Sequence, residues 1–125
     1  MKQHLLVVDD EPPIRELLAS YFTKHGYDVT TAADATETMR LADEVPLNLV
    51  ILDVLLPDSD GLEVLEKLKS AHPNLPIIII TGIGFDEELL QEAIQKGASG
   101  YVSKTLPLDQ LLMEVRRTLK YKAGH

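Results

Sequence analysis

Short apolar runs recur along the chain at nearly regular intervals. Five of them predict β-strands, at residues 5–8, 29–32, 49–52, 77–80 and 100–103. The third run (LVIL) and the fourth (IIII) are apolar at every position. Such continuous runs are typical of strands that are buried on both faces of a parallel sheet, so helices are expected on both sides of it.

The segments between and after these runs predict five amphipathic helices. Their apolar stripes are, in chain order, Ile14, Leu17, Leu18, Tyr21 and Phe22; Met39, Leu41 and Ala42; Leu62, Leu65 and Leu68; Leu89, Leu90, Ala93 and Ile94; and Leu108, Leu111, Leu112, Val115 and Leu119. Asp34 with Glu37 forms a capping-box-like start for the second helix. Gly26, Pro73 and Gly97 follow the first, third and fourth helices, where such residues end a helix.

Strand and helix thus alternate five times, at the length of βαβ crossover units. The pattern predicts a single α/β domain, a three-layer doubly wound (βα)5 fold with a parallel sheet. Right-handed crossovers leave few strand orders, and the pattern alone does not choose among them. We expect this domain to span residues 1–122, with residues 123–125 as a frayed tail.

Composition narrows the class of protein. With 125 residues and 45% hydrophobic content, the chain can bury one core without disulfides, and the absence of cysteine excludes thiolate chemistry. A net charge of −8 has the wrong sign for direct nucleic acid binding. No segment is apolar for long enough to be a signal peptide or a membrane span, so a cytoplasmic protein is expected.

Polar side chains with useful chemistry stand at the ends of four predicted strands. Asp9 and Asp10 follow the first strand, Asp53 the third, Thr81 the fourth and Lys104 the fifth. In doubly wound sheets, ligands bind beyond the carboxyl ends of the strands, beside the point where the strand order reverses. We therefore expect three carboxylates, a hydroxyl and an ammonium group to meet at one rim of the sheet.

Three adjacent carboxylates repel one another, and one lysine does not neutralise them, so a divalent cation is expected among them. Mg²⁺ suits this set best, because Ca²⁺ needs more oxygen ligands and Zn²⁺ prefers His or Cys. Mg²⁺ beside a lysine and a free carboxylate is typical of phosphoryl transfer. Asp53 is then the nucleophile, Lys104 and Thr81 bind phosphoryl oxygens, and Gly82 leaves room for the group.

Each of these residues also has a commoner structural role. Asp10 or Glu11 can cap a helix that Pro12 and Pro13 begin, with both acids in water. Threonine is frequent in strands, and a lysine after a strand is usually a solvated surface residue. The specific signal is that all of these residues occur together, on four strand ends.

These residues make the chain similar to the receiver domains of two-component response regulators, over essentially its whole length. The matching features are Asp9-Asp10, Asp53 in ILDVLLPDSDG, Leu56-Pro57, Asp60-Gly61, Thr81-Gly82, Lys104, and Tyr101 in GYVSK. The resemblance implies a flavodoxin-like strand order 2-1-3-4-5. It also implies that a histidine kinase phosphorylates Asp53, with Mg²⁺ held by Asp10, Asp53 and the backbone carbonyl of Leu55, and with Asp9 acting through bound water.

The resemblance further implies a switch. Phosphorylation would draw in Thr81 and let Tyr101 turn inward, which reshapes the surface of the fourth helix, fifth strand and fifth helix and so controls a partner or output domain. The segment GIGFDEE, at 82–88, is the expected soft element, because its two glycines loosen the loop. Family analogy also allows a phosphorylation-dependent homodimer through the face around Tyr101. Such a domain catalyses its own phosphorylation and dephosphorylation but acts on no separate substrate.

Three positions depart from the family pattern or tune it. The residue after Lys104 is usually a cis proline, but here it is Thr105, and a trans bond is expected because a non-proline cis bond costs about 3 to 4 kcal/mol. Leu55 and Ile83 flank the path of attack and are apolar, so the phosphoaspartate is expected to hydrolyse slowly.

Three other classes of protein share this α/β pattern or this chemistry. A flavodoxin would carry a Ser/Thr-rich phosphate loop after the first strand, and DDEPP has the opposite charge. A phosphatase with an aspartate nucleophile would need a D-x-D arrangement on that strand, which DDE does not supply. The remaining alternative is a phosphorylation-independent interaction module of receiver shape, which Thr105 keeps open.

Overall fold

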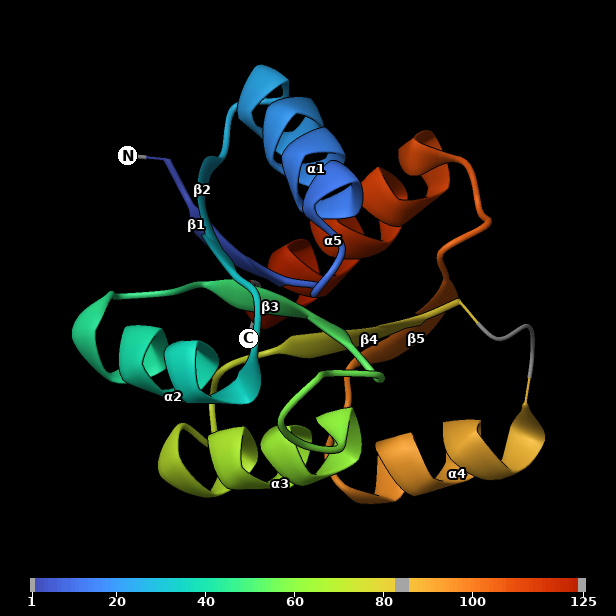
Figure 1. Cartoon of the computed structure of the whole chain (residues 1–125). Helices are drawn as coiled ribbons and strands as arrows, with labels where there is room; N and C mark the ends of the chain where they lie inside the picture. The colour runs from blue at the N-terminus through green and yellow to red at the C-terminus, as the bar shows by residue number, and fades with distance from the viewer. Residues whose placement is uncertain (1, 83–85, 124–125) are drawn as a thin grey trace.

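The computed structural model describes residues 2–82 and 86–123, in which strands and helices alternate as expected (Figure 1). The strands are β1 (His4–Val8), β2 (Asp28–Ala32), β3 (Leu49–Asp53), β4 (Ile77–Thr81) and β5 (Gly100–Ser103). The helices are α1 (Pro12–Lys24), α2 (Ala35–Glu44), α3 (Gly61–Ala71), α4 (Glu87–Gln95) and α5 (Leu108–Ala123). Each strand that the apolar runs predict is confirmed to within one residue at either end.

The five strands form one parallel sheet in the order β2-β1-β3-β4-β5, so the expected strand order is confirmed. Helices α1 and α5 cover one face, and α2, α3 and α4 cover the other (Figure 1). The chain leaves β1 for β2 on one side and then returns to β3 on the other side of β1. The strand order therefore reverses between β1 and β3, where a ligand site is expected.

The core consists of two hydrophobic clusters, one on each face of the sheet. On β3, Val50 and Leu52 belong to the cluster under α2, α3 and α4, whereas Leu49 and Ile51 belong to the cluster under α1 and α5. Every residue of β3 and β4 is buried. This double burial is why those two strands are apolar at successive positions.

The helix signals in the sequence mark real helix ends. The Asp34 carboxylate accepts a hydrogen bond from the Glu37 N–H at 2.8 Å, and Glu37 accepts one from the Ala33 N–H at 3.0 Å. Gly26 and Gly97 adopt φ angles of 94° and 103° after α1 and α4, in the left-handed region that glycine favours. Local side-chain chemistry thus sets the lengths of these helices.

Two further expectations concern the end of the domain and membrane-spanning helices. Helix α5 continues to Ala123, and the domain end at residue 122 stays a prediction. Among residues 2–82 and 86–123, no helix combines the length and the apolar character that crossing a bilayer requires.

Gly61 begins α3 directly against the end of β3. Its N–H donates to the Val54 carbonyl at 2.8 Å. A Cβ atom at this position would lie 2.5 Å from the Asp53 carbonyl oxygen and 2.6 Å from the Val54 Cα. Both neighbours are backbone atoms that cannot rotate away, so only glycine lets the helix start this close to the strand.

We expect Gly61→Ala to lower the free energy of unfolding by about 2–3 kcal/mol, because the methyl group forces two backbone segments apart. Urea unfolding at neutral pH measures this change. Gly100→Ala is the matched control, since its Cβ would meet Ile78 Cγ1 at an ordinary 3.5 Å. If both variants unfold like the wild type, the close approach at Gly61 does not constrain the fold.

Candidate functional site

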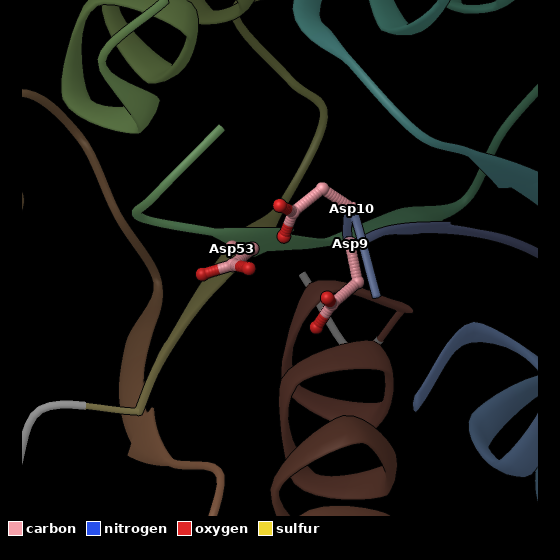
Figure 2. Close-up of side chains that lie close together, drawn as sticks. All are labelled: Asp9, Asp10 and Asp53. Atoms are coloured by element: carbon pink, nitrogen blue, oxygen red, sulfur yellow. The ribbon is translucent and has the colours of Figure 1, made fainter. Parts of the chain in front are cut away.

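The structure brings three carboxylates together where β1 and β3 lie side by side. Asp9 and Asp10 follow β1, and Asp53 is the last residue of β3. One oxygen from each of the three lies within 4.8 Å of the others. Figure 2 shows the Asp10 carboxylate directed toward Asp53 from the neighbouring strand end. The expected acidic cluster at the carboxyl ends of the strands therefore forms.

The two early acids differ in burial and in role. Asp9 is fully buried, and its Oδ1 accepts a hydrogen bond from the Glu11 N–H at 2.9 Å. The Arg15 guanidinium donates to the Asp9 carbonyl oxygen at 2.7 Å. Asp10 is exposed. Glu11 occupies the cap position of α1, but its side chain makes no capping hydrogen bond, so helix capping does not explain the acidic run.

Lys104 is the positive centre of the site. Its Nζ lies 2.8 Å from Asp53 Oδ2, 2.9 Å from Asp9 Oδ2 and 3.1 Å from Glu11 Oε1. Its backbone N–H donates to the Thr81 carbonyl at 2.8 Å, where β4 and β5 end together. One ammonium group thus binds three carboxylates that come from two different segments of the chain.

The peptide bond after Lys104 is trans, because the described residues contain no cis bond, and the expectation for Lys104-Thr105 is confirmed. The departure from a proline at this position does not turn the lysine away, since its ammonium group still reaches Asp53. Thr105 instead forms a local turn, in which its N–H donates to Ser103 Oγ at 3.1 Å.

Burial and charge shift the ionisation of the central pair. Burial raises the pKa of Asp53, which is 2% exposed, and the nearby charge of Asp9 raises it further, whereas hydrogen bonds from Lys104 and the Leu55 N–H oppose the rise. Burial alone would lower the pKa of Lys104. Its hydrogen bonds to Asp53, Asp9 and Glu11 outweigh that effect and raise the pKa, so the ammonium form dominates at neutral pH.

Oxygen atoms dominate the set of groups that could hold a cation. Besides the three carboxylates, Leu55 lies beside Asp53, because its N–H donates to Asp53 Oδ1 at 3.1 Å. Carboxylate and carbonyl oxygens are the ligands that hard divalent cations prefer. The donor chemistry of the site therefore fits such an ion.

Thr81 ends β4, and Tyr101 lies in the neighbouring strand β5, where it pairs with Ile79. Thr81 is buried, and the Tyr101 ring packs against the cluster under α2, α3 and α4. Burial raises the pKa of Tyr101, and the Asp86 backbone and the Thr81 side chain oppose that rise. Tyr101 is thus turned inward, with its hydroxyl beside Thr81.

Gly82 leaves open space beside Lys104. A methyl group at Gly82 would be 3.7 Å from Lys104 Cδ, an ordinary contact, so glycine is not sterically required there. The Leu55 side chain is 59% exposed at the edge of the site. The expected soft segment spans residues 82–88. Its residues 83–85, which include Ile83, lie outside the described residues.

Three residues at or near the site make contacts that the sequence did not predict. Glu11 pairs with Lys104, Arg15 binds the Asp9 carbonyl, and Asp58 binds the first turn of α2. Glu11 directly follows the acidic pair, and that position is a usable signal. No sequence pattern marks the contact of Asp58, because it joins segments 22 and 23 residues apart.

Comparison with known proteins agrees with this geometry. The family model of the response regulator receiver domain matches residues 5–116. The probable transcriptional regulatory protein TcrX of Mycobacterium tuberculosis is 34% identical over 93% of this chain, which spans only 49% of that protein. Sporulation initiation phosphotransferase F of Bacillus subtilis is 32% identical over 99% of both chains.

Solved structures give the same answer. A CheY-like receiver domain protein from Methanospirillum hungatei superposes with a TM-score of 0.93 over 99% of this chain and 98% of that one, at 28% identity. The chain therefore belongs to the receiver domains of two-component response regulators.

The carboxyl groups of Asp53 and Asp58 should titrate on opposite sides of the ordinary aspartate value of 3.8. The pKa of Asp53 is raised by burial, and that of Asp58 is lowered first by the Ala35 N–H. Because the folded state raises the pKa of Asp53, its contribution to stability falls as pH rises from the unfolded value through the folded one.

Carboxyl-carbon chemical shifts followed through a pH titration test this order. Lys104→Gln should raise the pKa of Asp53 further, because it removes the positive charge and the hydrogen bond from the ammonium group. Lys120→Gln, on the exposed side of α5, is the control and should leave it unchanged. An Asp53 that titrates below Asp58 would contradict the electrostatic account.

Proposed function

We propose that the chain is a phosphoacceptor switch, in which Asp53 takes a phosphoryl group from a histidine kinase with the help of Mg²⁺. The observation that carries this proposal is the hydrogen bond of Lys104 to Asp53 inside a cluster of three carboxylates. A structural ion pair would not need Asp10 beside it. Membership of the receiver family supports the same assignment.

The transfer needs a nucleophile, a place for the phosphoryl oxygens and positive charge. An oxygen of Asp53 attacks the phosphorus, the P–N bond to the donor histidine breaks, and its electron pair leaves with the imidazole nitrogen, which takes a proton from water. Lys104 and the Thr81 hydroxyl donate to phosphoryl oxygens, while Gly82 leaves them space.

A divalent ion has a defined role at this site. Asp10, Asp53 and the Leu55 carbonyl would hold Mg²⁺, with Asp9 acting through bound water. When bound, the ion supplies positive charge that offsets the charge of the carboxylates and of the incoming phosphoryl group. Asp9 keeps a second task in this scheme, since its contact with Lys104 holds the ammonium group next to Asp53.

The switch would run from Thr81 to the surface formed by α4, β5 and α5. Thr81 lies beside Tyr101, and Tyr101 packs under α4. A phosphoryl group that binds the Thr81 hydroxyl changes what the Tyr101 ring packs against, and so shifts the population of two surface arrangements. A partner protein, an output domain or a second phosphorylated copy would bind one arrangement better than the other.

The relatives bear on the output. TcrX is about twice as long as this chain and is named a transcriptional regulatory protein, whereas sporulation initiation phosphotransferase F has the same length as this chain. We propose that the output lies in a partner or in a further domain. With a net charge of −8, this domain does not contact nucleic acid itself.

Acetyl phosphate with Mg²⁺ should add one phosphoryl group to the wild type and none to Asp53→Asn, because an amide oxygen is a poor nucleophile. Intact-mass spectrometry measures the labelling, and a chelator should abolish it. Asp109→Asn, an exposed aspartate on α5, is the matched control and should label like the wild type.

Equal labelling of Asp53→Asn and wild type would exclude Asp53 as the acceptor. No labelling of either would favour a phosphorylation-independent interaction module. Following the label over time also tests the slow hydrolysis expected from the apolar Leu55 and Ile83, and rapid loss in magnesium buffer would contradict it.

Phosphorylation should change hydrogen exchange in residues 86–103 of the wild type, and Thr81→Val should largely lose that change at matched labelling. The reason is that valine keeps the shape of threonine but removes the hydroxyl that couples the phosphoryl group to Tyr101. Thr23→Val, the same exchange on the exposed face of α1, is the control. An unaltered response in Thr81→Val would place the coupling elsewhere.

A further inference from the structure

Asp58 fastens the loop after β3 to the first turn of α2. Its Oδ1 accepts a hydrogen bond from the Ala35 N–H at 2.8 Å. Its Oδ2 accepts from the Thr36 N–H at 3.2 Å and from the Thr36 hydroxyl at 3.1 Å. We call this set of three hydrogen bonds the Asp58 clasp.

The clasp completes the N-terminus of α2. The first N–H groups of a helix have no partner within it. Asp34 accepts the Glu37 N–H, and Asp58 accepts the two before it. A helix N-terminus also favours negative charge, and the hydrogen bonds from Ala35 and Thr36 lower the pKa of Asp58, so its carboxylate is ionised at neutral pH. The clasp is therefore charge-assisted.

The same loop is tied to the site at both of its ends. At its start, the Leu55 N–H donates to Asp53 Oδ1 at 3.1 Å. At its end, the Gly61 N–H donates to the Val54 carbonyl, and Leu55 pairs with Asp60 in an isolated bridge. These contacts hold the two ends of the loop, and the Asp58 clasp holds its middle, so the clasp further restricts the backbone that carries Leu55.

We propose that Asp58 is a positioning residue for the metal and phosphoacceptor site, and that it couples α2 to that site. The inference rests on the proposed function, because it concerns the Leu55 carbonyl as a ligand of Mg²⁺. With the clasp closed, the loop holds Leu55 beside Asp53 before the ion binds, which removes an ordering cost from binding. With the clasp broken, binding must order the loop first.

Coupling of this kind acts in both directions. If the closed clasp strengthens Mg²⁺ binding, then Mg²⁺ must strengthen the clasp by the same factor. The Ala35 and Thr36 N–H groups, which the clasp protects, report on it directly. Occupancy of the site is thereby transmitted to α2, on the edge of the molecule away from the α4, β5 and α5 surface.

The test measures Mg²⁺ affinity by calorimetry on the full chain. Asp58→Ala should weaken binding about 5- to 10-fold. Asp58→Asn should recover most of the loss, because its amide oxygen accepts the Ala35 N–H and its NH₂ donates to the Thr36 hydroxyl. Glu87→Gln, an exposed acid in the first turn of α4, removes the same charge without the clasp and should bind like Asp58→Asn or better.

Hydrogen exchange and urea unfolding complete the test. Mg²⁺ should slow exchange of the Ala35 and Thr36 amides in the wild type and have no such effect in Asp58→Ala. Equal affinities in wild type and Asp58→Ala overturn the proposal, and a loss of stability at unchanged affinity assigns the clasp to α2 alone. If the wild type binds no Mg²⁺, both the proposed function and the coupling fail. If Mg²⁺ binding depends on Asp58 but acetyl phosphate does not phosphorylate Asp53, only phosphoryl transfer is refuted.

Discussion

Repulsion among Asp9, Asp10 and Asp53 is the constraint on which this molecule depends. The parallel sheet places β1 beside β3, and both strands end on acids, so the fold itself forces the charges together. Two of the three are buried, where water screens them least. Lys104 offsets part of this repulsion, because its ammonium group contacts both Asp9 and Asp53.

One lysine leaves the cluster short of positive charge, and we propose that this shortage is the basis of its function. A site with balanced charge would bind a divalent cation more weakly, because affinity for such ions rises with the charge of the ligands. Exposed Asp10 adds negative charge at the open side, while Glu11 holds the ammonium group from a third direction. In the proposed scheme, these pairs stabilise the folded cluster, and the remaining negative charge attracts the cation.

The loop after β3 shows how the scaffold serves this site. Gly61 allows α3 to begin against the strand, which shortens the loop, and Asp58 ties the loop to α2. Neither residue is among the three that pair with the ammonium group of Lys104, yet both restrict the backbone that carries Leu55. The sterics of one glycine and the hydrogen bonds of one aspartate therefore act on the site through the chain between them.

The sequence by itself determined the secondary structure, the three-layer architecture and five polar residues of the site. It could do so because burial on both faces leaves a local apolar pattern, and because parallel strands deliver their carboxyl ends to one rim. Resemblance to the family supplied the strand order and singled out Tyr101. The roles of Glu11, Arg15 and Asp58 were decided only by the tertiary structure. Their partners come from backbone groups and side chains that packing brings within 3.2 Å, and no pattern along the chain encodes such distances.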